Sequence, residues 1–409
     1  MRRSALLLAA ALIFAALGNT PPARAADTAM TARPEIGQPV QAAEQLMKQK
    51  KYDAALVKLK AADAVPDKTA YERYVIAGTR AAIELNRGDD AAAITALEAV
   101  LATGILSPQD SLPRLEALVQ LNYRVKNYPG TVAAAQRYYK AGGGDPALRL
   151  LVAQSYYLQN DFADAAKTIR VILDADAKAG KRPEENLLLM LASSAYRQGD
   201  AVGQIAALER LAANYPKPQY WSELLAAIAK RPGFSSRLAL DLDRLKAATG
   251  VLASADDYME AAQRALLAGL PGDAKTLLAK GYAAGLLGKG AGAAREQRLA
   301  DMANHQAADD SKSLARQGSE AAAAADGLAW EKLGEAYASY GQYAEAIAAY
   351  RKAIAKGGLK QPEDARLHLG IAYLMAGDKT QARQTLAAVG GADGTRDLAQ
   401  LWLIEGGIS

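Results

Sequence analysis

The strongest constraint on this 409-residue chain is a pattern that occurs twice near its C-terminal end. Around Trp330 the pattern reads W-x2-L-G-x2-Y, and the second copy follows 36 residues later. The matching residues are Leu333, Gly334 and Tyr337 in the first copy and Leu369, Gly370 and Tyr373 in the second. Small residues at this spacing let two helices approach closely, and Gly341 is placed to end the first of them. One such hairpin cannot bury its apolar face alone, so the units must stack.

Weaker copies of the pattern run upstream through most of the chain. The best upstream unit covers about residues 146–179, and another covers about residues 255–287. The whole pattern predicts about eight or nine helical hairpins and no strand between residues 40 and 390. The composition agrees with an all-α fold, because alanine, leucine, lysine, glutamate and arginine, which favour helices, are abundant.

The pattern divides the chain into six segments. We expect a signal peptide, a flexible lead-in, an N-terminal set of hairpins, an irregular bridge of two helices, a pair of regular C-terminal units and a capping helix. These segments cover residues 1–25, 26–39, 40–287, 288–326, 327–390 and 391–409.

The N-terminal segment has the form of a secretory signal peptide. Arg2 and Arg3 supply the positive start, and an apolar run of 14 residues follows at 5–18. The small-x-small triplet that ends at Ala25 predicts cleavage after that residue. The run is shorter than the ~20 apolar residues of a membrane-spanning helix, so a retained anchor is the alternative. The sequence therefore predicts export to the periplasm.

Cysteine and charge exclude several kinds of function. The chain has no cysteine and only two histidines, His305 and His368, each of which we expect at the surface or at a repeat seam. We therefore predict no catalytic residue, no metal site and no cofactor. Removing residues 1–25 lowers the formal charge from +5 to +2, because three arginines and no acid leave with them. A balanced surface of this kind argues against a nucleic-acid partner.

The repeat pattern around Trp330 resembles the tetratricopeptide repeat (TPR) family. The resemblance implies an all-α solenoid, here in two arcs, whose first helices line a concave groove that binds a partner protein. Counted from each repeat start, the groove positions include Leu328, Glu331, Glu335, Leu367, Ile371 and Leu374 in the C-terminal units and Leu150, Gln154 and Tyr157 in the unit that starts at Pro146. The lysine and asparagine of carboxylate-clamp members are absent from these positions, so an amphipathic or basic segment is the expected ligand.

The stripe of Leu367, Ile371 and Leu374 has two interpretations. Their four- and three-residue spacing places them on one face of a helix, where they are available to a partner. Alternatively, the capping helix with Leu401 and Trp402 folds back and covers them, because a solenoid needs a cap at its end.

A narrower resemblance concerns segments in the second half of the chain. They are similar to exported TPR proteins that accompany TonB–ExbB–ExbD energy-transducing systems; the segments are 220–224, 269–274, 357–362 and the Ala399/Trp402 pair. This resemblance implies a non-enzymatic scaffold that binds a protein in the cell envelope. An enzyme or enzyme-associated module acting on peptidoglycan or polysaccharide is the rival hypothesis, and a polar structural spacer is a third. A cleft with paired, perturbed carboxylates would favour the enzyme.

Overall fold

The protein is all-helical over residues 30–409, which the computed structural model describes. No strand occurs in this range, and none of its helices is both long and apolar enough to cross a membrane. The predicted signal peptide and cleavage site lie outside the described residues. The described chain forms two compact units that divide between Lys181 and Arg182, and each is described separately.

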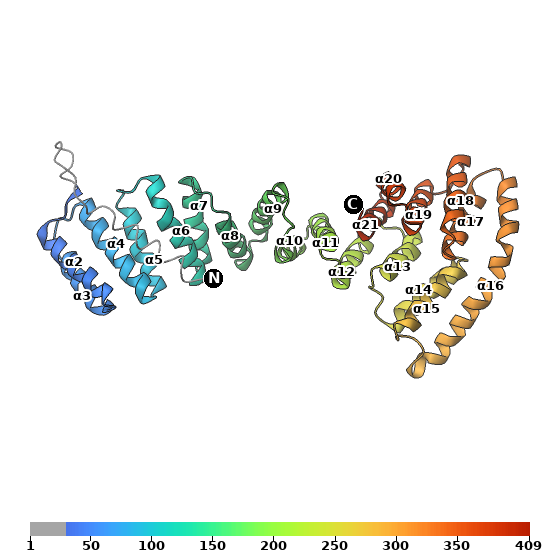
Figure 1. Ribbon diagram of the computed structural model, residues 1–409, viewed down its shortest axis with the longest axis horizontal. Helices are drawn as coiled ribbons and strands as arrows, with labels where there is room; N and C mark the ends of the chain where they lie inside the picture. The colour runs from blue at the N-terminus through green and yellow to red at the C-terminus, as the bar shows by residue number, and fades with distance from the viewer. Residues whose placement is uncertain (1–29) are drawn as a thin grey trace. The chain divides into compact units, whose positions relative to one another are not determined.

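The first unit is a row of four helical hairpins, each formed by two helices that follow one another in the chain (Figure 1). The hairpins are α2 (Pro34–Lys48) with α3 (Tyr52–Asp63), α4 (Ala70–Arg87) with α5 (Asp90–Ala102), α6 (Pro108–Arg124) with α7 (Tyr128–Lys140), and α8 (Pro146–Leu158) with α9 (Phe162–Lys178). Each second helix also packs on the first helix of the next hairpin, so the apolar faces are covered by stacking.

A recurrent turn sets the register of the hairpins. Asn127 and Asp161 cap the second helices of their hairpins, and each accepts a hydrogen bond from a backbone N–H three residues later, at 3.2 Å. The residue before each cap, Lys126 or Asn160, adopts φ near +60°, the left-handed conformation that ends the first helix. The same turn recurs at Asp200, which follows Gly199 with φ +71°. These turns identify equivalent positions in different repeats.

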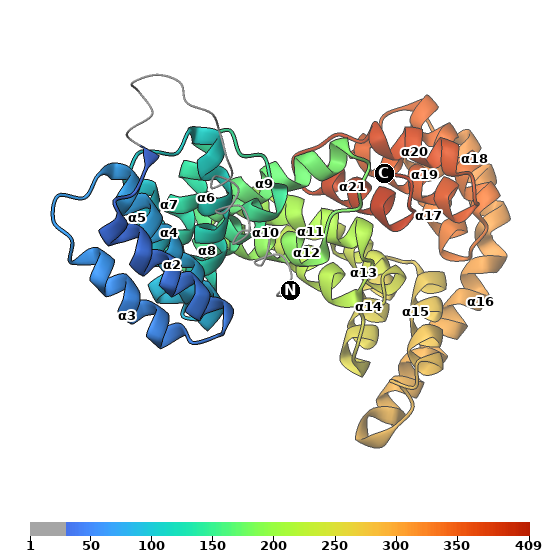
Figure 2. The same cartoon turned by 60° about the vertical axis from the view of Figure 1, so that its left-hand side comes forward.

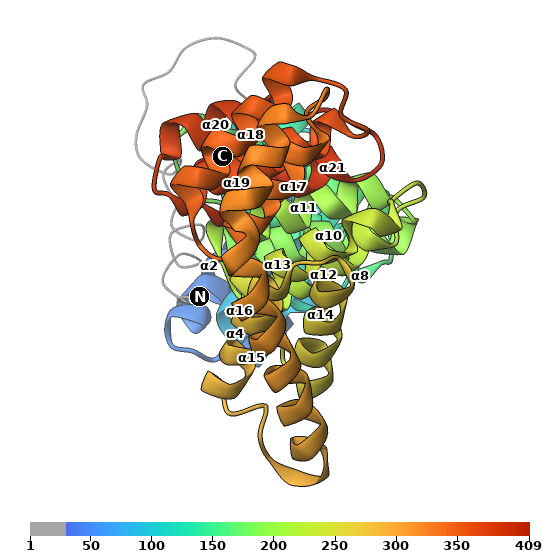
Figure 3. The same cartoon turned by 90° about the vertical axis from the view of Figure 1, so that its right-hand side faces the viewer.

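The second unit contains the less regular hairpins and the regular C-terminal pair. Its helices are α10 (Glu185–Gln198), α11 (Ala201–Asn214), α12 (Pro218–Ala229), the 3-10 turn η2 (Ser236–Leu238), α13 (Ala239–Ala248), α14 (Ala255–Leu267), α15 (Pro271–Ala283), the 3-10 turn η3 (Gly290–Gly292), α16 (Ala293–Ala323), α17 (Leu328–Ser339), α18 (Tyr343–Lys356), α19 (Pro362–Met375), α20 (Lys379–Ala387) and α21 (Thr395–Glu405). Figure 3 shows α16 as one long helix that packs against α15 and α17.

Two expectations from the sequence are corrected. The bridge at 288–326 holds one 31-residue helix, α16, and not two helices, because nothing in its polar sequence breaks the helix near residue 308. The lead-in becomes helical at Pro34, since a proline at the first helical position is tolerated there and Ile36 and Val40 pack into the core.

The close approach of α17 and α18 agrees with the repeat pattern. A Cβ added at Gly334 would lie 2.8 Å from the ring of Tyr350, which is itself only 2% exposed. Ala346 and Leu333 are fully or almost fully buried beside this contact. Only glycine therefore fits at 334 without moving an aromatic ring.

The last helix does more than cap the stack. Helix α21 packs on α19 and α20, and it also packs on α11 and α13, which lie far earlier in the chain (Figure 2). Arg231 bonds Asp397 at 2.7 Å, and Arg237 pairs with Asp364 and Asp393 at 2.7 and 2.8 Å. The second unit is thereby closed on itself, since its C-terminal hairpins return to its early helices.

Candidate functional site

A stripe of equivalent residues lies on the first helices of two neighbouring hairpins in the first unit. On α6 the stripe is Glu116, Gln120 and Tyr123, and on α8 it is Leu150, Gln154 and Tyr157. All six are half-buried, and both sets have spacings of four and three residues, which place each set on one helix face. We call these six residues the α6/α8 stripe.

Hydrogen bonds and rings hold the α6/α8 stripe in place. The Tyr123 hydroxyl donates to Gln154 Oε1 at 2.8 Å and links the two helices. Gln120 Nε2 donates to Glu116 at 3.2 Å, and the Tyr157 ring lies edge-on to Phe162 with centroids 5.5 Å apart. Burial raises the pKa of Glu116 and of Tyr123, so both lie partly out of water. The predicted residues Gln154 and Tyr157 are thus ordered and still reachable at the surface.

The tyrosine of this stripe recurs at a fixed distance from the turn. Tyr123 and Tyr157 each stand four residues before the residue that caps the next helix, Asn127 or Asp161. On α10 in the second unit, the same offset from Asp200 gives Tyr196, whose side chain is 68% exposed. Tyr196 is therefore more open to solvent than the half-buried Tyr123 and Tyr157 at the equivalent positions.

The equivalent stripe on α19 is partly covered by the chain itself: Leu367 is buried, and Ile371 and Leu374 are half-buried. Leu367 has no exposed surface, so the expectation that it faces an open groove is wrong. A Cβ added at Gly406, just after α21, would lie 2.7 Å from Leu374. Ile371 faces an internal cavity together with Trp402. The second interpretation therefore fits this stripe better, because α21 packs against α19 as well as against α11 and α13.

The two carboxylates predicted on α17 lie near a buried charge cluster. Glu335 is 3.5 Å from Nδ1 of His368, whereas Glu331 is half-buried and has its pKa raised by burial and by the charge of Glu335. Leu328, the third predicted residue on α17, is half-buried at the start of the helix. These residues therefore border an intramolecular contact, and only part of their surface reaches solvent.

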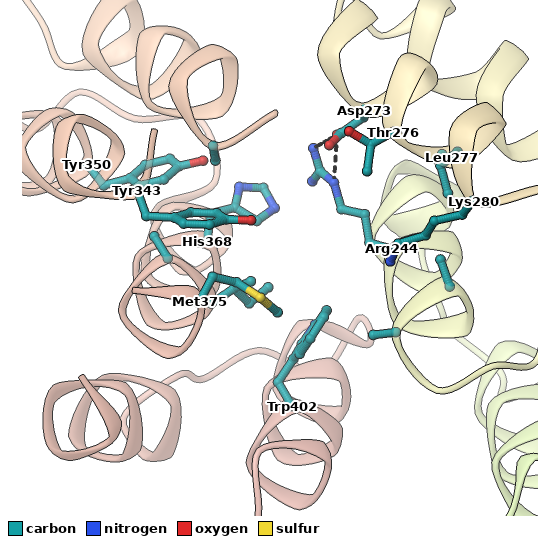
Figure 4. A pocket seen from close by; sticks show the side chains of 15 residues that line it. Arg244, Asp273, Thr276, Leu277, Lys280, Tyr343, Tyr350, His368, Met375 and Trp402 are labelled. Atoms are coloured by element: carbon teal, nitrogen blue, oxygen red, sulfur yellow. Dashed lines mark hydrogen bonds and ion pairs between the residues drawn. The ribbon is translucent and has the colours of Figure 1, made fainter. Parts of the chain in front are cut away.

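The charge cluster joins α13, α15 and α19 (Figure 4). Asp241 accepts from Arg244 Nη1 at 2.7 Å, and His368 Nε2 lies 2.9 Å from the same Asp241 oxygen. Arg244 also donates from Nε and Nη2 to Asp273, at 2.9 and 2.5 Å. Asp241 is 5% exposed and His368 8% exposed, so these charges are held away from water and must be paired.

The pairing shifts the pKa values of the cluster strongly. Burial by itself lowers the pKa of His368, but the charge and hydrogen bond of Asp241 outweigh it and bring the pKa to about 9. Burial by itself raises the pKa of Asp241, but His368 and Arg244 bring it well below its usual range. At neutral pH the cluster therefore contains an imidazolium and an ionised carboxylate.

A cavity of about 160 Å³ opens beside the cluster. Figure 4 shows Arg244 and Lys280 on one wall and Tyr343, His368, Met375 and Trp402 on the other. The rest of the lining is mostly apolar and includes Leu277 and Ile371. Two buried nitrogens of lining residues, His368 Nδ1 and Trp402 Nε1, have no hydrogen-bond partner within the described residues.

Two tetratricopeptide repeat families match the sequence, one over residues 337–402 and one over residues 187–218. These stretches include most of the C-terminal pair of hairpins and the hairpin that carries Tyr196. Within these two stretches the chain is similar to tetratricopeptide repeats. No functionally curated protein matches the sequence.

Two solved structures of other repeat proteins show low sequence identity and low structural similarity to this chain. The TPR2AB domain of yeast Sti1, from a complex with pHSP90, is 12% identical, covers 71% of this chain and 97% of its own, and has a TM-score of 0.23. The pentatricopeptide repeat protein PPR10 from maize is 14% identical. The match covers 100% of this chain and 67% of PPR10, with a TM-score of 0.29. At these scores the likeness carries no argument about a ligand.

The acidic side chains of the cavity lining bear on the enzyme hypothesis. Asp273 is the only carboxylate in the lining, and Arg244 binds it. The pair of perturbed carboxylates that would favour an enzyme is therefore missing from this lining. Within residues 30–409 no group of three or more acidic or histidine side chains is arranged to hold a metal ion.

Sequence reasoning missed the charge cluster, although one signal pointed to it. His368 was expected at a surface or seam, yet its partner Asp241 lies 127 positions earlier, on an unrelated repeat. The available signal was the run LALDLDRL around Asp241, in which acids alternate with leucines inside a helix. Carboxylates placed among buried apolar residues usually need a buried cation.

Proposed function

We propose that this protein is a non-enzymatic TPR scaffold of the bacterial cell envelope that binds a partner protein on the α6/α8 stripe. TPR proteins are generally binding scaffolds without catalysis. The observation that carries the proposal is a contrast at one repeat position. Leu150 on α8 is half-buried, as is the rest of the α6/α8 stripe, whereas the equivalent Leu367 on α19 is fully buried by the chain itself.

The chemistry of the stripe fits a peptide segment. Tyrosine rings give contact area at a small entropic cost, and glutamine amides can bond the main chain of an extended or helical segment. Glu116 adds one negative charge, which favours an amphipathic or basic segment over an acidic one. This composition differs from a nucleic-acid surface, which needs clustered cations.

The envelope location rests on the predicted signal peptide, and a TonB-type energy-transduction or transport system is the context suggested by the sequence resemblance. N-terminal sequencing of the protein from the envelope fraction tests the location. We expect the mature chain to begin at Ala26, whereas a retained Met1 would mean a membrane anchor.

Site-specific crosslinking in cells tests the partner site. A photoreactive phenylalanine replaces Tyr157 or Tyr123 in two separate variants, and Val171, a 46% exposed residue on the second helix α9, serves as the matched control. We expect both stripe positions to capture the same protein and position 171 to capture none. Capture from all three positions, or from none, would contradict the proposal.

The captured protein is then purified and its affinity is measured. Hot-spot tyrosines contribute roughly 2 kcal/mol or more to binding, so Tyr157→Ala is expected to weaken the complex by about 30-fold. Val171→Ala is expected to leave the affinity unchanged. An equal effect of both substitutions would place the binding surface elsewhere.

A further inference from the structure

An open groove lies between the first two hairpins of the first unit. It has a volume of about 390 Å³ and is bordered by the end of α3 on one side and by α5 on the other, with the buried residues Ile76 and Ala77 of α4 at its floor. It shares no residue with the α6/α8 stripe, so its use is independent of the partner site proposed above. Its lining differs from the equivalent surface of the next hairpin in two ways.

The first difference is an arginine at a core position. Nine residues before the cap of the second helix, α6 has Leu118 and α8 has Val152. These side chains are buried, at 0% and 8% exposed. On α4 the same position is Arg80, whose side chain is 37% exposed and pairs with Asp63. A charged side chain therefore lines the groove where an apolar side chain packs in the neighbouring hairpins.

The second difference is an alanine in place of a bridging arginine. The equivalent gap between α5 and α7 is spanned by Arg137, which pairs with Glu98 at 2.8 Å. Arg137 stands ten residues after the cap of its helix, and the same position on α5 is Ala99. Alanine cannot form an ion pair with Lys60, the residue of α3 that corresponds to Glu98, so the gap between α3 and α5 is not bridged at this position.

The face of α5 that borders the groove is formed by small, uncharged side chains. Thr95, Ala99 and Ala102 are exposed there, and their spacing of four and three residues places them on one helix face. Both acids of α5 pair instead with arginines of the next hairpin. Because an exposed helix face usually carries charged or strongly polar side chains, this alanine face is suited to contact with small apolar groups of a partner.

The side of the groove formed by α3 and α4 is positively charged. Lys68, Arg73 and Arg80 line it, and Asp63, which pairs with Arg80, is the one acid among the described lining residues. Lys68 Nζ donates to the carbonyl oxygens of Asp63 and Val65 at 2.7 and 2.6 Å, and Arg73 Nη1 donates to that of Lys68 at 2.5 Å. These acceptors are main-chain groups, so the charges of Lys68 and Arg73 are not neutralised by a carboxylate, and Arg73 is exposed to solvent.

We propose that this groove binds an acidic peptide segment of a partner protein. Carboxylates of the segment pair with Arg73 and Arg80, and its small side chains lie on the alanine face of α5. A guanidinium has five N–H donors, so Arg80 can keep Asp63 and still meet a second carboxylate. A basic segment would meet like charge, and a single small anion would leave the alanine face uncovered. The expected charge of this segment is opposite to that of the segment expected at the α6/α8 stripe.

Fluorescence anisotropy on the mature full-length protein tests the proposal. The probe is the fluorescein-labelled peptide EAAEAAEEAA, measured at about 0.15 M salt, where attraction between distant exposed charges is screened. We expect saturable binding to one site. The analogue with glutamine in place of every glutamate is expected to bind about tenfold more weakly, because it cannot form ion pairs with the arginines.

Two variants change the groove in different ways. Arg73→Glu reverses one of its charges, whereas Ala99→Trp fills the alanine face and leaves the charge unchanged. Each is expected to weaken binding of the acidic peptide by about tenfold. The matched controls are Lys140→Glu and Ala133→Trp, at exposed positions of α7 outside the groove, and both are expected to bind like the wild type. Circular dichroism of each variant verifies that the fold is kept.

Four results would overturn the proposal. Absence of binding at millimolar peptide would do so directly. An equal loss of affinity in Arg73→Glu and Lys140→Glu would mean that the peptide senses only the net charge of the protein. An unchanged affinity of Ala99→Trp would exclude the contact with α5. Displacement of the peptide by an equal concentration of inorganic phosphate would assign the groove to a small anion instead.

Discussion

The same repeat position has opposite surroundings in the two units. On α8, Leu150, Gln154 and Tyr157 are all half-buried. On α19 the equivalent Leu367 is fully buried, while Ile371 and Leu374 are half-buried beside a cavity and the end of α21. Both stripes have the same spacing on a first helix, so the repeat itself does not decide their exposure. What decides it is whether a later helix returns to cover the face, and within residues 30–409 such a helix, α21, is found in the second unit. A position in a repeat is therefore a candidate for binding, and tertiary closure determines whether it is available.

The largest expected effect comes from placing a charge at this position in each unit. Leu367→Asp buries a carboxylate without a partner and removes a packed side chain, so it is expected to lower the free energy of unfolding of the second unit by about 5 kcal/mol or more. Leu150→Asp, at the half-exposed equivalent, is expected to cost about 1–2 kcal/mol. Urea unfolding curves measure both. Equal losses would mean that the stripe on α8 is as closed as that on α19.

The charge cluster sharpens the comparison, because it is confined to the second unit. Asp241→Asn leaves Arg244 and His368 without their shared carboxylate, and breaking a buried ion pair in this way costs about 3–5 kcal/mol. Asp309→Asn removes an exposed partner of Lys312 and is expected to change stability by less than about 0.5 kcal/mol. Thermal melts of the two variants test this difference in stability. Similar melting temperatures would contradict the buried pairing of Asp241.

The pH dependence of the second unit follows from His368. The pKa of this group is raised from 6.5 to about 9 on folding, so its contribution is complete below pH 6.5 and is lost as the pH rises through 9. The groups that face it are Asp241 and Arg244 on α13, Glu335 on α17 and Tyr350 on α18. We expect a loss of up to about 3 kcal/mol between pH 6.5 and 10.

Two measurements check this pH effect. Urea unfolding of the wild type at several pH values gives the slope, and His368→Gln supplies the control because it cannot titrate. The variant is expected to show a flatter profile in this pH range, whatever its absolute stability. A wild-type profile as flat as that of the variant would show that the imidazole is not charged in the folded state.

The smallest expected effect concerns the helix contact at Gly334. Gly334→Ala puts a methyl group 2.8 Å from the Tyr350 ring and is expected to destabilise the second unit by about 1–3 kcal/mol. Gly37→Ala, in α2 of the first unit, meets no atom within 4 Å and is expected to stabilise by about 0.5–1 kcal/mol. Melting curves with the same sign for both substitutions would mean that the repeat register is misassigned.

The sequence was sufficient for what depends on neighbouring residues. The glycine at 334, the turn at Gly341 and the last helix with Trp402 are all encoded within one or two repeats, and the structure has them where the pattern placed them. Periodicity did not distinguish two bridge helices from the single α16, because that segment is polar and contains no strong helix breaker.

The candidate pocket could not be predicted in the same way. Its residues come from repeats that are not neighbours in the sequence, as the 127-residue separation of Asp241 and His368 shows. No spacing rule links positions so far apart, and the burial of Leu367 depends on the same long-range return of α21. The surface position of Gln154 and Tyr157 depends only on neighbouring hairpins, and their role in binding a partner stays a prediction.

The return of α21 also fixes the order in which the molecule can fold. Hairpins of the first unit need only contacts to the next hairpin, so they can form one after another as the chain emerges from the ribosome or a translocation channel. In the second unit, the bonds of Arg231 and Arg237 to Asp397 and Asp393 span more than 150 residues and cannot form before residues 393–405 are present. Loop closure over that distance is slow. Until it happens, the apolar face of α19 and the charges around Asp241 remain uncovered, and the unfinished second unit is the part of the chain that a chaperone would need to protect.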